Sequence, residues 1–313
     1  FQALANVAKC FHTKLVTTHP MAKMEQPNVV HIEFDEHHAM DDAKRIVKMA
    51  IDNFQERGAE IMIPQIKSPM VAGFGVESIQ YHLGGTFRGT YYTLNDNIIN
   101  GRIRGLAGVV GCNNARTKHN ECHIEIIKEL IKNDVLVLST GCSAMTAGMH
   151  GLLTPESAAV HCGPGLAEIC ETVGIPPVLH LGSCVDNSRI LLAATEVIKA
   201  GGLGKDLCDI PAAGSAPEWM SEKAIAIGQY FVSSGVYTVF GNYLPVEGAP
   251  VFKKYLFEDL EKVYGGKWDC EPDPIKHARL MIAHIDKKRK ELGIDKARER
   301  VLMDMADRQA LEA

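Results

Sequence analysis

The sequence predicts an α/β fold with a Rossmann-like, doubly wound and mostly parallel sheet. Apolar segments of strand length alternate with segments of helical periodicity over most of the chain, and this alternation is typical of parallel sheets with helices on both faces. The 313 residues are 46% hydrophobic, which is enough for one large core or two ordinary ones. Three predicted strands, at residues 105–110, 135–138 and 178–181, each lead into a cysteine.

Residues 1–65 are predicted to be the C-terminal part of one Rossmann-like domain, and residues 66–313 to form a second one. The elements predicted in the first part are a helix at 1–11, strands at 14–18 and 29–34, a helix at 41–57 and a strand at 61–63. Apolar residues share one face of the helix at 41–57, and Gly58 is a suitable C-cap. Residues 64–69 are predicted to be a linker. Because the chain begins with Phe1 inside a predicted helix, we expect an upstream domain.

The second part contains the longer α/β series. Besides the three strands already named, its predicted elements are a glycine-punctuated segment at 71–83, a polar loop at 84–100, helices at 120–132, 186–199 and 218–233, strands at 207–211 and 236–240, and final helices at 251–263 and 274–292. A turn-rich segment at 212–217 is predicted to separate strand 207–211 from helix 218–233. The strands therefore alternate with helices, as a parallel sheet requires.

Composition and charge argue against several classes of protein. The formal net charge is −5 and the chain has no long basic run, so we expect no nucleic-acid partner. No apolar run is long enough to span a bilayer, and no secretory signal pattern opens the sequence, so we expect a cytoplasmic protein. The nine cysteines are odd in number and dispersed, which does not fit a disulfide framework. Because no G-x-G-x-x-G follows a predicted strand, a nucleotide is not the expected ligand.

Cys112, Cys142 and Cys184 follow three separate predicted strands. In an open α/β sheet, ligands bind beyond the carboxyl ends of the strands, so we expect these thiols to converge. A helical pattern follows each cysteine, and a helix N-terminus stabilises a thiolate. Convergent thiolates favour an iron–sulfur centre, and the wide spacing argues against a zinc knuckle. The alternative is that all three are small buried thiols packed at strand ends.

Lys223 is predicted to lie near the start of helix 218–233, where it can point into the same crevice. A lysine there can hydrogen-bond an oxyanion or move a proton. The alternative is a solvated lysine on the first helical turn. His180 is predicted to be a core histidine within its strand. The remaining cysteines are predicted to be structural; they are Cys10, Cys122, Cys162, Cys170, Cys208 and Cys270.

Five short segments together resemble one known family. They are residues 111–114 (GCNN), 140–142 (TGC), 161–165 (HCGPG), 182–189 (GSCVDNSR) and 221–224 (SEKA). In this order they resemble the C-terminal half of the catalytic subunit of anaerobic nickel–iron–sulfur carbon monoxide dehydrogenase, and the similarity extends nearly to Ala313. The resemblance implies the end of a middle Rossmann-like domain followed by a complete C-terminal one.

The resemblance also implies a reaction and roles for individual residues. The reaction is CO + H₂O ⇌ CO₂ + two protons + two electrons, at a nickel–iron–sulfur cluster. Cys112 and Cys142 would bind iron atoms of this cluster, and Cys184 would bind nickel. Lys223 would be the catalytic basic residue beside the substrate. Ile227 would form part of the apolar wall of the substrate channel.

Further ligands and partners follow from the same resemblance. The cluster needs one histidine and two more cysteines from upstream, and further [4Fe-4S] clusters are expected there. Electrons would pass to a ferredoxin-like acceptor, and the family implies a homodimer. The sequence leaves open whether the enzyme works alone or with an acetyl-CoA synthase. Two alternatives also stay open: a hybrid-cluster (hydroxylamine reductase-like) enzyme, and a cluster-free Rossmann-like interaction module.

Overall fold

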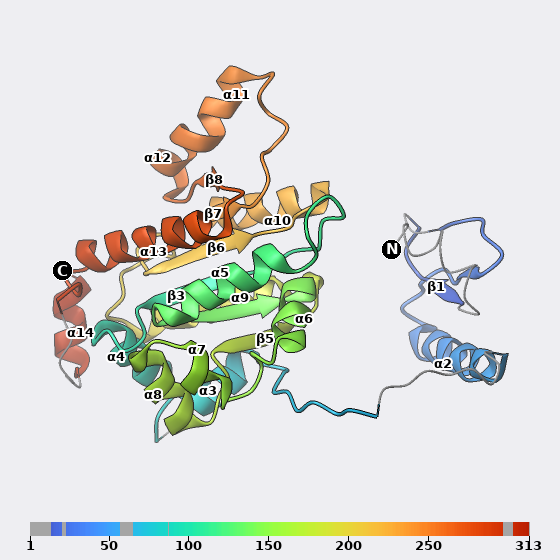
Figure 1. Cartoon of the computed structure of the whole chain (residues 1–313), viewed down its shortest axis with the longest axis horizontal. Helices are drawn as coiled ribbons and strands as arrows, with labels where there is room; N and C mark the ends of the chain where they lie inside the picture. The colour runs from blue at the N-terminus through green and yellow to red at the C-terminus, as the bar shows by residue number, and fades with distance from the viewer. Residues whose placement is uncertain (1–13, 21–22, 57–64, 87, 297–302, 313) are drawn as a thin grey trace. The chain divides into compact units, whose positions relative to one another are not determined.

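The structure of the protein is a computed structural model, which describes residues 14–20, 23–56, 65–86, 88–296 and 303–312. The chain divides into two compact units, Phe1–Lys67 and Ser68–Ala313 (Figure 1). The helix predicted at 1–11, the strand predicted at 61–63 and Cys10 lie outside the described residues. Among the described helices, none combines the length and the apolar character that a membrane span needs.

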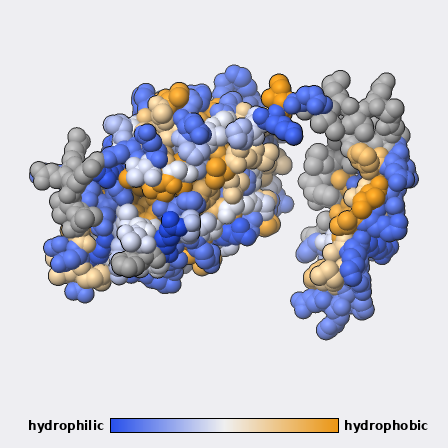
Figure 2. All heavy atoms as spheres, turned by 90° about the horizontal axis from the view of Figure 1, so that it is seen from below, coloured by the Kyte–Doolittle hydropathy of each residue, from blue (hydrophilic) through white to orange (hydrophobic). Residues whose placement is uncertain are grey.

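The first unit contains two short parallel strands and one helix. Strand β1 (Leu15–Thr17) pairs with β2 (Val29–His31), and the Thr17 Oγ1 lies 2.7 Å from the Nδ1 of His31. Helix α2 (Ala39–Glu56) follows, as its amphipathic pattern predicts. None of its described side chains is buried within the unit, and hydrophobic side chains are exposed on its surface (Figure 2). Its assignment to a middle Rossmann-like domain stays a prediction.

The second unit is built on a six-stranded sheet in which every strand pairing is parallel. Its strands are β3 (Gly105–Val109), β4 (Val135–Thr140), β5 (Val178–Gly182), β6 (Ala212–Ala216), β7 (Tyr237–Phe240) and β8 (Trp268–Cys270). They lie in the order β5-β4-β3-β6-β7-β8. Counted from β3, this is the 3-2-1-4-5-6 order of the Rossmann fold, with its topological switch point between β3 and β6. The predicted Rossmann-like fold class is therefore confirmed.

Helices cover both faces of this sheet. On one face, α5 (Glu121–Lys132) lies beside α13 (Pro274–Glu291) (Figure 1). On the other face, α9 (Ser188–Ala200) contacts α3 (Val76–Leu83) and α4 (Tyr92–Ile99). The remaining helical segments are α6 (Gly141–Met149), α7 (Ser157–His161), α8 (Pro164–Val173), η2 (Cys184–Asp186), α10 (Glu222–Ser233), α11 (Pro250–Lys254), η3 (Tyr255–Asp259), α12 (Leu260–Tyr264) and α14 (Met305–Glu312). Strand interiors such as β4 are buried throughout, because both faces are covered.

The structure corrects the predicted elements around β6. Residues 207–211, predicted to be a strand, form turns, in which Asp209 accepts hydrogen bonds from the backbone N–H groups of Lys205 and Asp206. The strand is instead β6 (Ala212–Ala216), within the segment 212–217 that was predicted to be turn-rich. Its small residues, AAGSA, lack the β-branched pattern of a strand, but they fit a central position between two covered faces. The predicted helix 218–233 starts later, at Glu222, and β8 was not predicted at all.

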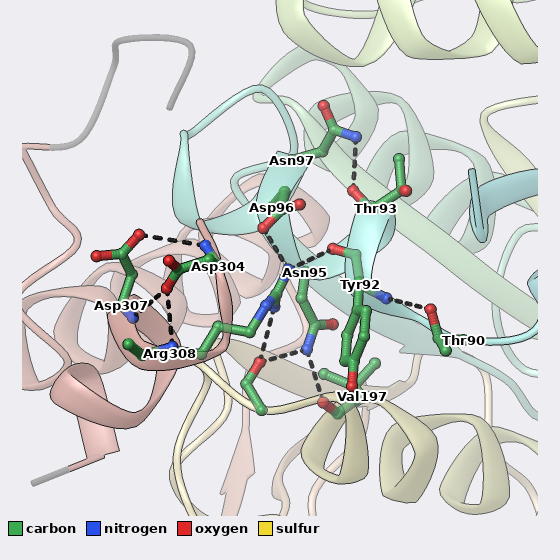
Figure 3. Close-up of polar contacts among 12 residues, drawn as sticks. Thr90, Tyr92, Thr93, Asn95, Asp96, Asn97, Val197, Asp304, Asp307 and Arg308 are labelled. Carbon is green, nitrogen blue, oxygen red and sulfur yellow. Dashed lines mark hydrogen bonds and ion pairs between the residues drawn. The ribbon is translucent and has the colours of Figure 1, made fainter. Parts of the chain in front are cut away.

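The polar segment 84–100, predicted to be a loop, contains helix α4. Asn95 is fully buried there, and its Nδ2 donates to the carbonyls of Val197 and Gly201 at 2.7 and 2.8 Å. Arg308 of α14 is also buried, where it donates to the carbonyl of Gly201 and pairs with Asp96 (Figure 3). The polar residues of this segment are thus held in the core by hydrogen bonds. A pattern of hydrophobic residues does not predict such contacts.

Candidate metal centre

The carboxyl ends of β3, β4 and β5 present the three predicted metal ligands. Cys112 follows Gly111, whose φ of +114° turns the chain at the end of β3. Cys142 lies in the first turn of α6, and Cys184 begins η2. Because these strands are neighbours in the sheet, the three cysteines lie along one edge. Cys112 does not lie at a helix N-terminus, because α5 begins only at Glu121, close to the predicted start of helix 120–132.

The turn before Cys184 depends on glycine and on one carboxylate. Gly182 has a φ of +133°, and a Cβ at this position would lie 2.4 Å from the Oδ2 of Asp186. That oxygen accepts a hydrogen bond of 2.8 Å from the N–H of Ser183, and Arg189 pairs with the other oxygen at 3.1 Å. These bonds hold Cys184 at the end of β5, so the segment GSCVDNSR builds the turn that presents this thiol.

The Cys142 and Cys184 turns are also tied to each other. The hydroxyl of Thr140 donates to the Oδ1 of Asn187, and both side chains are buried. Gly141 has a φ of +59°, and a Cβ there would lie 3.2 Å from the Cβ of Cys184. Glycine therefore permits the close approach of the two turns. Asn187 was not predicted as a site residue; its position within the GSCVDNSR segment is the sequence signal that could have identified it.

Lys223 occupies the first turn of α10 and reaches Cys184. Its Nζ lies 3.1 Å from the Sγ of that cysteine. This hydrogen bond raises the pKa of Lys223, burial opposes the shift, and interactions with the Cys112 and Cys142 thiolates add to it. Lys223 is exposed, as the alternative interpretation expects, but its ammonium group is hydrogen-bonded to the Cys184 thiol.

A small, mostly apolar cavity lies beside these groups. It has a volume of about 30 Å³ and is lined by Cys112, Cys184, Lys223, Ile227 and Asn187, among others. Burial raises the pKa of the Cys112 thiol, and the Lys223 ammonium opposes this shift. The structure therefore brings four of the five predicted site residues to one cavity. The exposed Cys142 lies outside its lining.

A buried serine–histidine pair also borders this cavity, and sequence reasoning missed it. Ser215 lines the cavity, and its Oγ lies 2.7 Å from the Nε2 of His277. The Nδ1 of His277 lies 3.0 Å from the carbonyl of Glu271. Burial lowers the pKa of His277 to about 4, so the ring is neutral at pH 7. No motif marks either residue, because the pair joins strand β6 to helix α13.

Other cysteines and histidines lie in structural surroundings. Cys170 is fully buried in the core, where burial raises the pKa of its thiol to about 12. Burial also raises the pKa of Cys270 to about 11. His180 lies within β5, as predicted, but it is half-buried instead of lying in the core; its Nδ1 accepts a hydrogen bond from the N–H of Gly182. These groups are unsuited to act as thiolates or free ligands.

The donor set suits an iron–sulfur type of group better than a single ion. Within the described residues, no three His, Cys, Asp or Glu side chains are placed to hold one metal ion together. A cluster, however, binds its thiolates at different metal atoms, so the three thiols need only line one edge. The cysteines are unpaired thiols, and the glycines at 111, 141 and 182 let the backbone turn around them. The residues present therefore fit part of a cluster site.

Sequence comparison assigns the chain to a known family. The model of the Prismane/CO dehydrogenase family matches residues 1–275, so the chain belongs to that family.

Particular relatives share high identity. The chain is 48% identical over 294 residues to carbon monoxide dehydrogenase 1 of Methanosarcina mazei, covering 94% of this chain and 45% of the relative. It is 39% identical to a carbon monoxide dehydrogenase/acetyl-CoA synthase subunit beta of Moorella thermoacetica, covering 94% and 45%. A solved carbon monoxide dehydrogenase from Thermococcus sp. AM4 aligns with a TM-score of 0.81 at 49% identity, covering 93% and 45%. The chain thus spans less than half the length of these relatives.

Proposed function

We propose that this chain is the C-terminal portion of an anaerobic carbon monoxide dehydrogenase, an oxidoreductase that interconverts CO and water with CO₂, two protons and two electrons. The observation that supports this most directly is the 3.1 Å contact between Lys223 Nζ and Cys184 Sγ. A cation lies beside a thiol at the carboxyl ends of the parallel strands, in a chain whose similar relatives are named carbon monoxide dehydrogenases. Those names favour this function over the hydroxylamine reductase alternative.

In this proposal, Cys112 and Cys142 bind iron and Cys184 binds nickel of a nickel–iron–sulfur cluster. When bound, the cluster supplies Lewis-acid and redox chemistry to the substrate. The chain's own residues then do two things. The Lys223 ammonium donates a hydrogen bond to the oxygen atoms of CO₂ or a carboxylate, and it holds a proton close to them. Ile227 and the apolar lining of the cavity keep bulk water away and leave room for a small apolar gas.

The remaining partners are proposed for the whole protein. One histidine, two cysteines and further [4Fe-4S] clusters are proposed to come from residues outside these 313, since the relatives are about twice as long. A homodimer in the cytoplasm with a ferredoxin-like acceptor completes the proposal. An acetyl-CoA synthase is a candidate partner, because one relative is named as a subunit of such an enzyme.

The test is the metal content of Cys184→Ala in the full-length protein, purified without oxygen. Removal of this thiolate should abolish nickel binding while most of the iron remains, since Cys112 and Cys142 are intact. Cys208→Ala is the matched control, because Cys208 is a half-buried cysteine that does not line the cavity. Full nickel occupancy in Cys184→Ala would count against the assignment. Absence of iron, sulfide and nickel from the parent protein would instead favour the cluster-free interaction module.

A further inference from the structure

Glu218 is a carboxyl group that is completely buried in the segment between β6 and α10. Its Oε2 accepts a hydrogen bond of 3.1 Å from the Nδ2 of Asn113. Its Oε1 is buried without a hydrogen-bond partner among the described residues. A buried, incompletely bonded carboxyl group costs folding free energy. Such groups in native proteins call for an explanation other than packing.

Hydrogen bonds continue from Asn113 toward the helix of Cys142. The Nδ2 of Asn113 also donates to the Oδ1 of Asn120 at 2.7 Å. The same Oδ1 accepts a hydrogen bond of 2.8 Å from the hydroxyl of Thr146, which lies 3.0 Å from the carbonyl of Cys142. One buried network therefore joins the residue next to Cys112, the start of α5 and the first turns of α6.

The Cys112 turn has two additional tethers. The Nδ2 of Asn114 donates to the carbonyl of Trp219 at 2.9 Å. The Nε2 of the fully buried His123 lies 2.8 Å from the carbonyl of Cys112. Because no helix begins at Cys112, these side chains supply the restraint that a helix N-terminus supplies at Cys142. The residues after β6, which lead into Lys223, are bonded to the same turn.

We propose that Glu218, Asn113, Asn120 and Thr146 form a positioning network, which fixes the Cys112 turn to the Cys142 helix and to the segment that leads into Lys223. The inference rests on the proposed function, which assigns Cys112 and Cys142 to the cluster and Lys223 to the substrate. It adds the residues that set the relative positions of these three side chains. Since Glu218 lies outside the cavity lining, it acts through Asn113 and not on the substrate.

Thr146 offers the cleanest test, because valine has nearly the same shape as threonine. Thr146→Val removes the hydroxyl that joins Asn120 to α6, whereas Thr146→Ser keeps it. A second pair is Glu218→Leu, which removes the acceptor for Asn113, and Glu218→Gln, which keeps an amide oxygen in its place. In the full-length protein, purified without oxygen, we would measure iron and nickel per chain, the electron paramagnetic resonance spectrum of the cluster, kcat and KM for CO, and Tm.

Thr146→Val and Glu218→Leu should alter the cluster spectrum and lower either iron occupancy or kcat by about tenfold, the scale for groups that orient metal ligands. The serine and glutamine variants should stay close to the parent. If Thr146→Val and Glu218→Leu change only Tm, the network is purely structural and the proposal is wrong. Should Glu218→Leu fail to fold, the Thr146 pair decides. A parent that holds the metals but does not oxidise CO would refute the proposed function, while spectrum and occupancy still test the network.

Discussion

At the amino ends of the strands in the large sheet, the half-buried Arg104 and the buried Arg289 each have several hydrogen-bond acceptors. The guanidinium of Arg104 makes two bonds to Asp286, at 2.6 and 2.7 Å. Arg289 donates to the carbonyls of Ile98, Arg104 and Ile294. At the carboxyl ends, by contrast, the buried carboxyl of Glu218 has one hydrogen-bond partner among the described residues.

The polar groups at the two ends of the sheet have different roles: those at one end stabilise the fold, and those at the other serve the chemistry of the site. Arginine pairs with well-aligned acceptors stabilise the folded state. Buried polar atoms that lack a hydrogen-bond partner cost folding free energy and call for an explanation other than stability. Among the described residues, buried polar atoms without a hydrogen-bond partner occur at both edges: Arg102 Nη2 lies just before β3, whereas His123 Nδ1, Ser143 Oγ and Glu218 Oε1 lie near the segments that present Cys112 and Cys142. We infer that the amino edge anchors the fold and the carboxyl edge serves the site.

The largest expected effect is a loss of stability on removal of Arg289 at the amino ends of the strands. Arg289→Ala leaves buried carbonyls without their donor, which should lower the free energy of unfolding by on the order of 4 kcal/mol. Below the reduced Tm, the metal content should be unchanged. Lys290→Ala, an exposed neighbour on α13, should stay within about 0.5 kcal/mol of the parent. Urea unfolding measures both values; equal losses in the two variants would contradict this division of roles.

The next effect concerns His277 behind the site. Its pKa is lowered to about 4, whereas a histidine in an unfolded chain titrates near pH 6.5. The unfolded chain therefore takes up a proton first as the pH falls. The resulting stability is fully present above about pH 6.5 and is lost toward pH 4, by about 3 kcal/mol in total. Between pH 7 and pH 5, the free energy of unfolding, measured with urea, should fall more in the parent than in His277→Gln. Parallel curves would refute this.

The smallest expected effect tests Lys223. Lys223→Ala should leave iron and nickel bound and lower kcat for CO oxidation by about 10²-fold, the scale of one lost acid–base or oxyanion group. At about 2.7 kcal/mol, this loss should appear in turnover and not in unfolding, since the lysine is exposed over much of its length. Unchanged turnover in a metal-replete variant would remove Lys223 from the proposed mechanism.

Much of the fold and of the candidate site follows from local sequence signals. Apolar runs predicted β3, β4, β5 and β7, because covered parallel strands need hydrophobic residues on both faces. Glycines at 111, 141 and 182, one or two residues before these cysteines, turn the chain at the strand ends. The repeated strand–cysteine pattern then placed these thiols at one edge, since parallel strands end on the same side of a sheet.

Other features depend on residues that are distant in sequence. Strand β6 consists of small residues and α4 is rich in polar ones, so local patterns misplaced both. The burial of Glu218, the pairing of Ser215 with His277 and the 3.1 Å approach of Lys223 to Cys184 arise from packing between separate elements. Sequence periodicity determined four of the six strands of the large sheet, which are β3, β4, β5 and β7. Only the tertiary structure decided which polar groups meet, because burial and hydrogen-bond partners depend on the neighbours that the fold brings together.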